Sequence, residues 1–209
     1  FCSGKWAINN LKKYKGVKVN TKENTLLDSL RIAINNQNKI KIETPKSKYC
    51  VVTIHRFENI SSKERFEYII KLIEEISQKI KILFILHPPT RKKLEEYNLF
   101  NKLSKSPKIE LRPRYDYFDF IRLINKSEFI ISDGGSNQEE SYYLGKPCLL
   151  LRYKTERKEG LGKNVILSEF KEDKINNFIN NYKKYKIKVS NQKISPSEII
   201  IKEIKRFAK

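Results

Sequence analysis

Five short apolar runs constrain the fold of this chain more than any other feature of its sequence. They cover residues 49–54, 80–86, 129–132, 148–151 and 165–167. None of them alternates apolar with polar residues, so both faces of each strand should be buried, as in a parallel sheet that helices cover on both sides. With 39% hydrophobic and 11% aromatic residues, the chain has enough apolar material for one such core.

Amphipathic helical patterns lie between most of these runs, with stripes at residues 66–80, 118–124 and 175–182. Ser61 and Glu64 have the spacing of a capping box at the start of the first of these helices. Ser195-Pro196 opens the last helix with a cap and a Pro at the first helical position. The alternation of strands and helices predicts an α/β fold, a doubly wound parallel sheet of the Rossmann-like type.

The first 40 residues differ from the rest. Two helical stretches at residues 5–14 and 23–36 flank a short expected strand at 17–19, and the polar segment 36–48 is expected to be a linker. We therefore expect residues 1–40 to be a remnant of a preceding domain and residues 41–209 to form one α/β domain. The chain contains no Met, even at its first position, so we expect it to be a fragment of a longer protein.

The net charge of +20 has two explanations. A nucleic-acid-binding module is one, but such surfaces favour Arg forks and interleaved aromatic residues, whereas here Lys is spread along the chain. A solvated lysine-rich surface is favoured, and its field would still attract a nucleotide diphosphate. No apolar run approaches the roughly 20 residues that a membrane span requires. The three cysteines lack CxxC spacing and are expected to be buried thiols in a reducing cytosol.

Both histidines of the chain directly follow apolar runs. His55 follows the run at 49–54, and His87 follows the run at 80–86. In open parallel sheets ligands bind at the carboxyl ends of the strands, so both histidines are candidates for a site there; the alternative is that they only terminate strands. A metal site is not expected, because no third ligand lies at a familiar spacing.

The strongest local signal is the segment 131–140, where a buried strand ends at Gly134-Gly135 and a helix opens. Glycine lets the backbone approach a ligand closely, and the unpaired N–H groups of a first helical turn favour an anion such as a pyrophosphate. The segment is neither a P-loop nor a dinucleotide fingerprint nor a hydrolase elbow. Glu140 would repel phosphate, so it is expected either to face ribose hydroxyls or to interact with the helix N-terminus.

Taken together, these segments resemble the UDP-N-acetylglucosamine 2-epimerase family. The resemblance is carried by residues 52–59, 87–88, 117–120, 133–140, 144–147 and 155–160, whose order and spacing hold from about residue 49 to 168. Its most specific parts are Gln138-Glu139-Glu140 and Thr155-Glu156-Arg157. The family implies two Rossmann-like domains of the glycosyltransferase-B type with the active site between them, and this chain corresponds to the C-terminal, UDP-binding domain.

The resemblance also implies roles for individual residues. His55 would lie near the reacting sugar and its phosphate as the catalytic residue, and Phe120 would pack near the uracil. Glu140 would hold the ribose, and Arg157 would support the diphosphate. The rest of the implied UDP-binding set is Arg56, His87, Gly134, Gly135 and Ser136, of which the last three would cradle the diphosphate.

The family reaction eliminates UDP from C1 as a proton leaves C2, and then adds UDP back with the proton on the other face; a hydrolysing branch releases N-acetylmannosamine. The resemblance implies no metal and no cofactor, UDP and UDP-N-acetylhexosamine as ligands, no membrane or nucleic-acid partner, and a cytoplasmic homodimer in polysaccharide biosynthesis. The protons are handled by carboxylates of the N-terminal domain, so this fragment alone is expected to be inactive. A UDP-sugar glycosyltransferase of the same fold is the alternative enzyme.

Two segments depart from the family pattern. The usual Ser-Gly-Gly reads Gly134-Gly135-Ser136, so the residue that gives the hydroxyl contact differs. The usual Pro-Leu before the aromatic segment reads Arg114-Tyr115, which indicates a subgroup with its own substrate preference.

Overall fold

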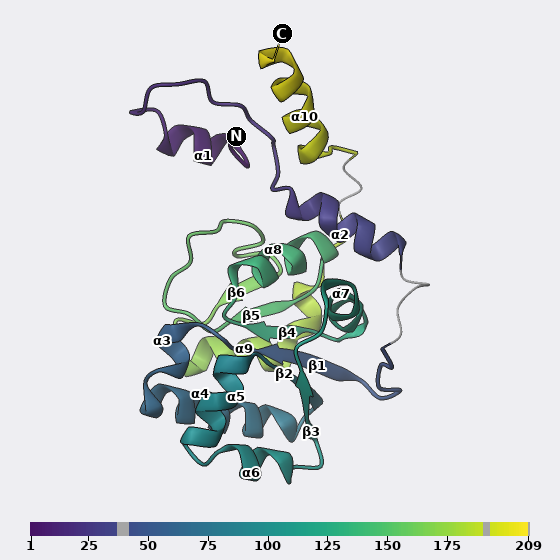
Figure 1. The fold of residues 1–209 in the computed structure, drawn as a ribbon. Coiled ribbons are helices and arrows are strands. Elements are labelled where there is room, and N and C mark those ends of the chain that lie inside the picture. The colour runs from purple at the N-terminus through teal and green to yellow at the C-terminus, as the bar shows by residue number, and fades with distance from the viewer. Residues whose placement is uncertain (37–41, 190–192, 209) are drawn as a thin grey trace.

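The computed structural model describes residues 1–36, 42–189 and 193–208. Its centre is a six-stranded sheet in which every strand pair is parallel, with the order β3-β2-β1-β4-β5-β6 (Figure 1). The strands are β1 (Tyr49–Thr53), β2 (Lys81–Leu86), β3 (Ile109–Pro113), β4 (Ile130–Ser132), β5 (Cys148–Leu150) and β6 (Val165–Leu167). The predicted doubly wound parallel sheet is confirmed.

All five apolar runs became strands, but β3 was not predicted. Its sequence, Ile109-Glu110-Leu111-Arg112-Pro113, alternates apolar with polar residues, and only Ile109 is buried. This strand lies at the edge of the sheet and pairs with β2 alone, so it does not need two apolar faces. Pro113 is tolerated at its end because an edge strand has a side without ladder partners.

Helices cover both faces of the sheet (Figure 1). One apolar cluster packs against α3 (Phe57–Ile60), α4 (Lys63–Ser77), α5 (Pro88–Glu96), α6 (Phe100–Ser104) and α9 (Glu172–Asn181). The other packs against α2 (Leu26–Asn35), α7 (Tyr117–Lys126) and α8 (Gly135–Leu144). The short helix α1 (Lys5–Asn10), the 3-10 helix η2 (Tyr182–Tyr185) and α10 (Pro196–Phe207) complete the described elements. None of the described helices is long and apolar enough to cross a membrane.

The helix caps follow the sequence with one correction. The side chain of Ser62, not Ser61, accepts the Arg65 N–H at the start of α4, because the helix begins one residue later than the capping-box spacing indicates. The side chain of Ser195 accepts the Glu198 N–H at the start of α10, as predicted.

The first 36 residues contain less regular structure than predicted. Residues 17–19 are not a strand; instead an isolated bridge joins Cys2 and Asn20. Helix α2 packs through Leu27, Leu30 and Ala33 into the same apolar cluster as α7 and α8. The predicted domain boundary at residues 40 and 41 lies outside the described residues.

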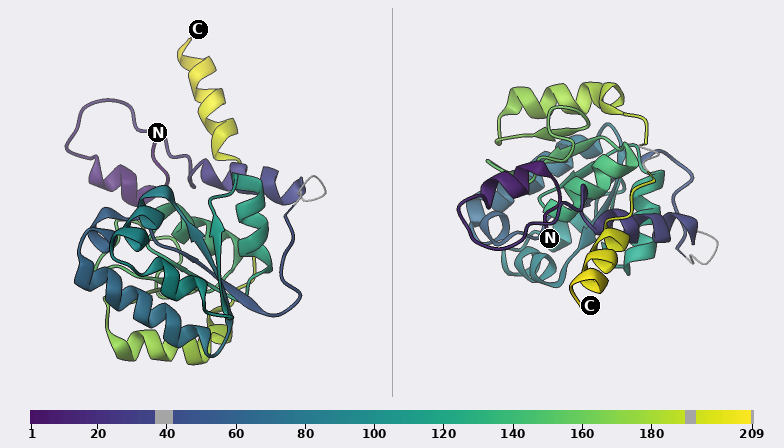
Figure 2. Two further views of the ribbon diagram at one scale, coloured as in Figure 1. Left: turned by 60° about the horizontal axis from the view of Figure 1, so that its bottom comes forward. Right: turned by 90° about the horizontal axis from the view of Figure 1, so that it is seen from above.

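Helix α10 is attached to α2 at its base. The Ser197 N–H donates to the Asp28 carboxylate at 2.8 Å, and the Arg31 guanidinium donates to the Ile194 carbonyl. Beyond this attachment α10 projects away from the domain (Figure 2). Three of its large apolar residues, Ile201, Ile204 and Phe207, are exposed.

Candidate functional site

The two histidines lie side by side at the carboxyl edge of the sheet. His55 follows β1 and His87 follows β2, and these strands are neighbours. Their rings stack with centroids 4.5 Å apart and an interplanar angle of 22°. Burial, followed by the charges of His55 and Arg114, lowers the pKa of His87 to about 4. His87 is therefore neutral at physiological pH, so it can both donate and accept a hydrogen bond.

Asp133 fixes the backbone that carries His55. Its fully buried carboxylate accepts the N–H groups of His55 at 3.1 Å and Arg56 at 2.9 Å, and the Asn59 amide at 2.9 Å. The Nδ1 atom of His55 lies 3.3 Å from the Asp133 carboxylate. Sequence reasoning did not single out Asp133, although an Asp directly after a buried strand was the available signal.

The glycine turn between β4 and α8 allows three side chains to approach the backbone closely. A Cβ atom on Gly134 would lie 2.5 Å from the Asn137 side-chain oxygen and 3.1 Å from Cε1 of His55. A Cβ atom on Gly135 would lie 2.6 Å from Nε of Arg157. Helix α8 begins at Gly135, so its first N–H groups face the same edge of the sheet and can bind an anion there.

Arg157 is held over this turn by α8. Its guanidinium forms an ion pair with Glu139, which is 2% exposed. The Gln138 amide donates to the carbonyls of Arg157 and Glu159 at 3.2 and 3.0 Å, and Thr155 donates to the Gln138 side-chain oxygen at 2.8 Å. These contacts place a guanidinium next to the α8 N-terminus, where a diphosphate would find a second positive group.

Glu140 is a buried carboxylate whose charge is only partly compensated. It is 3% exposed and accepts a hydrogen bond from the Asn137 amide at 2.9 Å. Burial raises the pKa of Glu140 to about 7, while Asn137 and Tyr117 oppose the rise. Such a group is poised to accept hydrogen bonds from a ligand's hydroxyl groups, which would stabilise its ionised form.

A pocket of about 270 Å³ joins several of these groups. It is lined by His55, Ile85, His87, Arg114, Tyr115, Asp116, Tyr117, Phe120, Ser136, Asn137 and Glu140. Five of the predicted site residues thus share one pocket. Gly134, Gly135 and Arg157 lie beside it, and the Arg56 side chain pairs with Glu58. Sequence reasoning did not place Tyr117 or Asn137 in the site.

The described residues hold no group of three or more His, Cys, Asp or Glu that could bind a metal ion. All three cysteines are buried and free, as predicted. The polar groups present at this edge are imidazoles, carboxylates, a guanidinium and a helix N-terminus.

The sequence profile of the family described as UDP-N-acetylglucosamine 2-epimerase matches residues 7–197. The chain belongs to this family. The UDP-N-acetylglucosamine 2-epimerase of Methanocaldococcus jannaschii is 37% identical over 163 residues, which cover 73% of this chain and 44% of the relative. That of Methanococcus maripaludis is 37% identical over 176 residues, which cover 78% of this chain and 48% of the relative. This member of the epimerase family thus spans about half the length of the curated relatives it matches.

Solved epimerase structures share the fold. A crystal structure of the Methanocaldococcus jannaschii UDP-GlcNAc 2-epimerase in complex with UDP-GlcNAc and UDP has a TM-score of 0.78 at 30% identity, over 96% of this chain and 59% of that one. The Neisseria meningitidis enzyme bound to UDP-GlcNAc has a TM-score of 0.72 at 26% identity, over 88% of this chain and 54% of that one.

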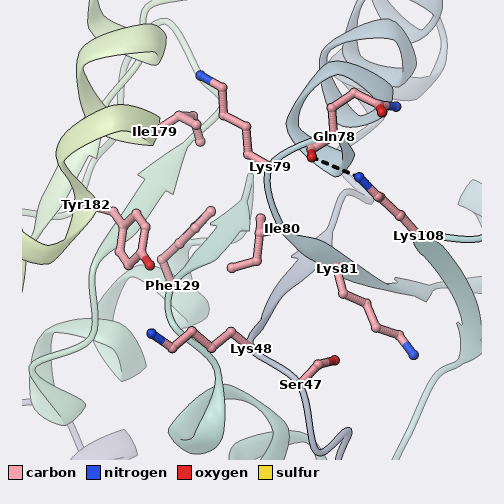
Figure 3. Close-up of a pocket in the computed structure, with 10 residues that line it drawn as sticks. All are labelled: Ser47, Lys48, Gln78, Lys79, Ile80, Lys81, Lys108, Phe129, Ile179 and Tyr182. Carbon is pink, nitrogen blue, oxygen red and sulfur yellow. Dashed lines mark hydrogen bonds between the residues drawn. The ribbon is translucent and has the colours of Figure 1, made fainter.

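A second pocket of this epimerase-family chain lies at the opposite edge of the sheet, where β1 and β2 begin (Figure 3). It encloses about 320 Å³ and contains four lysines. Three of them bond to local acceptors: Lys79 to Asn180 at 2.7 Å, Lys81 to Glu110 at 2.9 Å and Lys108 to the Gln78 carbonyl at 2.9 Å. We do not assign the nucleotide to this pocket, because ligands of open parallel sheets bind at the carboxyl edge.

Proposed function

We propose that this chain is the UDP-binding C-terminal half of a UDP-N-acetylglucosamine 2-epimerase. The complete enzyme would interconvert UDP-GlcNAc and UDP-ManNAc, or hydrolyse the substrate to ManNAc and UDP. One observation carries the proposal: a single pocket is lined both by the first turn of α8, at Ser136, and by the buried carboxylate of Glu140. A diphosphate and a ribose need these two environments next to each other. The relatives crystallised with UDP or UDP-GlcNAc support it.

Each part of the nucleotide sugar has a proposed place. The diphosphate lies on the first turn of α8 over Gly134, Gly135 and Ser136, with Arg157 beside it. The ribose hydroxyls donate to Glu140. Phe120 packs against the base. Arg56 contributes its positive charge beside the diphosphate, because its guanidinium pairs with Glu58 and, together with a backbone hydrogen bond and Arg152, also lowers the pKa of Glu156, the neighbour of Arg157.

His55 is the proposed catalytic residue, and neutral His87 supports it by ring stacking. His55 would act on the sugar and the phosphate at the C1 side, where the bond to UDP breaks. The reaction also requires a base at C2 and an acid on the opposite side of the ring. The described residues at this edge offer imidazoles from one wall only, so the second wall must supply the C2 groups.

The remaining assignments follow from the same proposal. Residues 1–40 would form the junction to an N-terminal domain, and residues 41–209 the UDP-binding domain. The complete enzyme would be a cytoplasmic homodimer that serves cell-surface polysaccharide synthesis, without nucleic acid as a partner. The excess of Lys would then act as a solvated surface that attracts the anionic substrate.

Calorimetry with UDP on residues 1–209 tests the binding half of the proposal. We expect UDP to bind, more weakly than it binds a complete enzyme, because the facing domain contributes no contacts. No binding at millimolar UDP would contradict the site assignment. A salt series separates the nucleic-acid alternative, whose affinity should fall steeply as salt rises.

Incubating the complete protein with UDP-GlcNAc and no acceptor tests the chemistry. Release or interconversion of the sugar supports the epimerase, whereas turnover only after an acceptor is added supports the glycosyltransferase. Residues 1–209 alone should show no turnover between pH 6 and 9, because one open wall cannot orient an acid and a base on both sides of the ring.

A further inference from the structure

Arg114 is a charged residue of the pocket that the roles proposed so far do not use. It lies in the loop between β3 and α7 and lines the pocket with His87 and Phe120. In the part of the chain that the structure describes, no hydrogen bond or ion pair of its guanidinium is found. By contrast, nearby Arg112 pairs with Glu110 at 2.7 Å. A guanidinium left unpaired beside a pocket is available to a ligand.

The order of groups along the pocket indicates which part of a nucleotide Arg114 faces. If the diphosphate lies on the α8 N-terminus and the ribose on Glu140, the base must lie farther along the pocket, because the three parts of a nucleotide are joined in that order. The strand order β3-β2-β1-β4 puts the loop after β3, which carries Arg114, three strands away from β4, which leads into α8. Phe120, proposed to pack against the base, lies in α7 directly after this loop and lines the same pocket, so Arg114 lies at the end of the pocket that receives the base.

The chemistry of the guanidinium selects among bases. Arg has five N–H donors and no acceptor, so it matches a carbonyl oxygen and opposes an amino group. The pyrimidine edge remote from the ribose carries an oxygen at C4 in uracil and an amino group at C4 in cytosine. We infer that Arg114 is a specificity-determining residue that donates to the C4 oxygen of the base and disfavours cytosine. This inference rests on the proposed UDP site and adds the selection of the base to it.

The alternative is a nonspecific role, in which Arg114 only adds to the positive field that attracts the diphosphate. UDP and CDP separate the two explanations, because they carry the same ribose and diphosphate. A general field acts equally on both nucleotides, whereas a hydrogen bond to the C4 oxygen acts on UDP alone.

The test is calorimetry of UDP and CDP on residues 1–209 at fixed ionic strength, with Arg114→Met and the matched control Lys126→Met. Lys126 is exposed in the last turn of α7, outside the pocket, so its variant removes the same charge. The unchanged chain should prefer UDP over CDP by about tenfold, in line with a charged hydrogen bond. Arg114→Met should lose about tenfold in UDP affinity, keep its CDP affinity and lose the preference. Lys126→Met should retain both affinities.

The possible failures are distinguishable. If the unchanged chain binds neither nucleotide, the proposed function itself is wrong. If it binds UDP but Arg114→Met keeps the preference for UDP, or loses UDP and CDP affinity equally, only the inference about Arg114 is overturned. The conservative Arg114→Lys, which keeps one donor but not the planar fork, should lie between the two.

Discussion

The two edges of the parallel sheet carry opposite kinds of polar residue. At the carboxyl edge the carboxylates of Asp133, Glu139 and Glu140 are 0%, 2% and 3% exposed. At the amino edge Lys79 and Lys108 are exposed and bond to neutral acceptors close by. Burying a carboxylate costs free energy unless partners replace its water, whereas an exposed ammonium costs little.

This difference between the two edges indicates that the buried carboxylates lower the stability of the ligand-free fold, as is typical of a ligand site. Within the described residues, the buried side-chain atoms without a hydrogen-bond partner include Oε2 of Glu139 and Nε of Arg157 at the carboxyl edge. Buried polar atoms are normally satisfied, so a group of unsatisfied ones indicates a site that is completed by something else. Charge alone would have pointed to the lysines at the amino edge instead.

The variant His55→Ala in the complete enzyme should give the largest effect and tests most directly whether the carboxyl edge, and not the amino edge, carries the chemistry. We expect turnover to fall about a thousandfold, the range of general acid–base catalysis, while UDP affinity changes little. Lys48→Ala, at the rim of the amino-edge pocket, is the matched control and should leave turnover unchanged. A coupled assay for the released or interconverted sugar measures both. Near-normal turnover of His55→Ala would remove His55 from the chemistry.

Asp133→Asn should produce the next largest effect, on stability. The new amide group must face one of the N–H donors of His55, Arg56 or Asn59, so about 3 kcal/mol of the free energy of unfolding should be lost. Urea denaturation measures it. Asp173→Asn in the exposed first turn of α9 should cost less than about 0.5 kcal/mol. Equal effects would show that Asp133 does not organise the edge.

Glu140→Gln should separate binding from stability. The affinity for UDP should fall by about 1.5–3 kcal/mol, the value of charged hydrogen bonds, and by more than in Glu139→Gln. Consistent with a ribose contact, 2′-deoxy-UDP should bind more weakly than UDP to the unchanged chain. If 2′-deoxy-UDP binds as well as UDP, the ribose role of Glu140 is wrong.

The same variant should stabilise the ligand-free chain at high pH. Because the pKa of Glu140 is raised from 4.5 to about 7 on folding, the folded state binds the proton more tightly, and stability falls as pH rises from 4.5 to 7. At about 1.4 kcal/mol per pKa unit, Glu140→Gln should regain about 3 kcal/mol above pH 7 and nothing below pH 4. Denaturation midpoints at pH 4 and pH 8 provide the measurement.

The smallest effect is expected at the amino edge. Lys79→Ala and Lys108→Ala remove exposed charges far from the proposed site, so UDP affinity should change less than twofold at physiological ionic strength, where the Debye length is about 8 Å. Calorimetry on each variant decides this. A tenfold loss would mean that the pocket in Figure 3 takes part in nucleotide binding.

Sequence patterns were sufficient where the signal is local. Continuous apolar runs predicted the four inner strands and the edge strand β6, and the position after a run placed His55 and His87 at the correct edge. They failed where the role depends on a distant partner. Strand β3 alternates and was not predicted, because at its edge of the sheet only Ile109 is buried, a property that only the assembled sheet defines.

The same reason explains the site residues that were missed. Asp133 is defined by three donors from the loop after β1, which no spacing in the sequence reveals. Asn137 matters because its side chain bridges Ser132 and Glu140 at 2.9 Å each. Arg114 was visible only as a departure from the family pattern, until the pocket showed what it lines.

The contact between Asp133 and the backbone of His55 also constrains the order in which parts of the domain can fold. The two residues are 78 positions apart, and β4 must dock beside β1 before the carboxylate can reach those N–H groups. A chain leaving the ribosome can form the β1–α4–β2 unit early, since its parts are adjacent in sequence. The carboxyl edge, where the nucleotide is proposed to bind, cannot take shape until residue 133 has emerged. Variants that slow the docking of β4 should therefore delay the gain of UDP binding while the first βαβ unit forms at its usual rate.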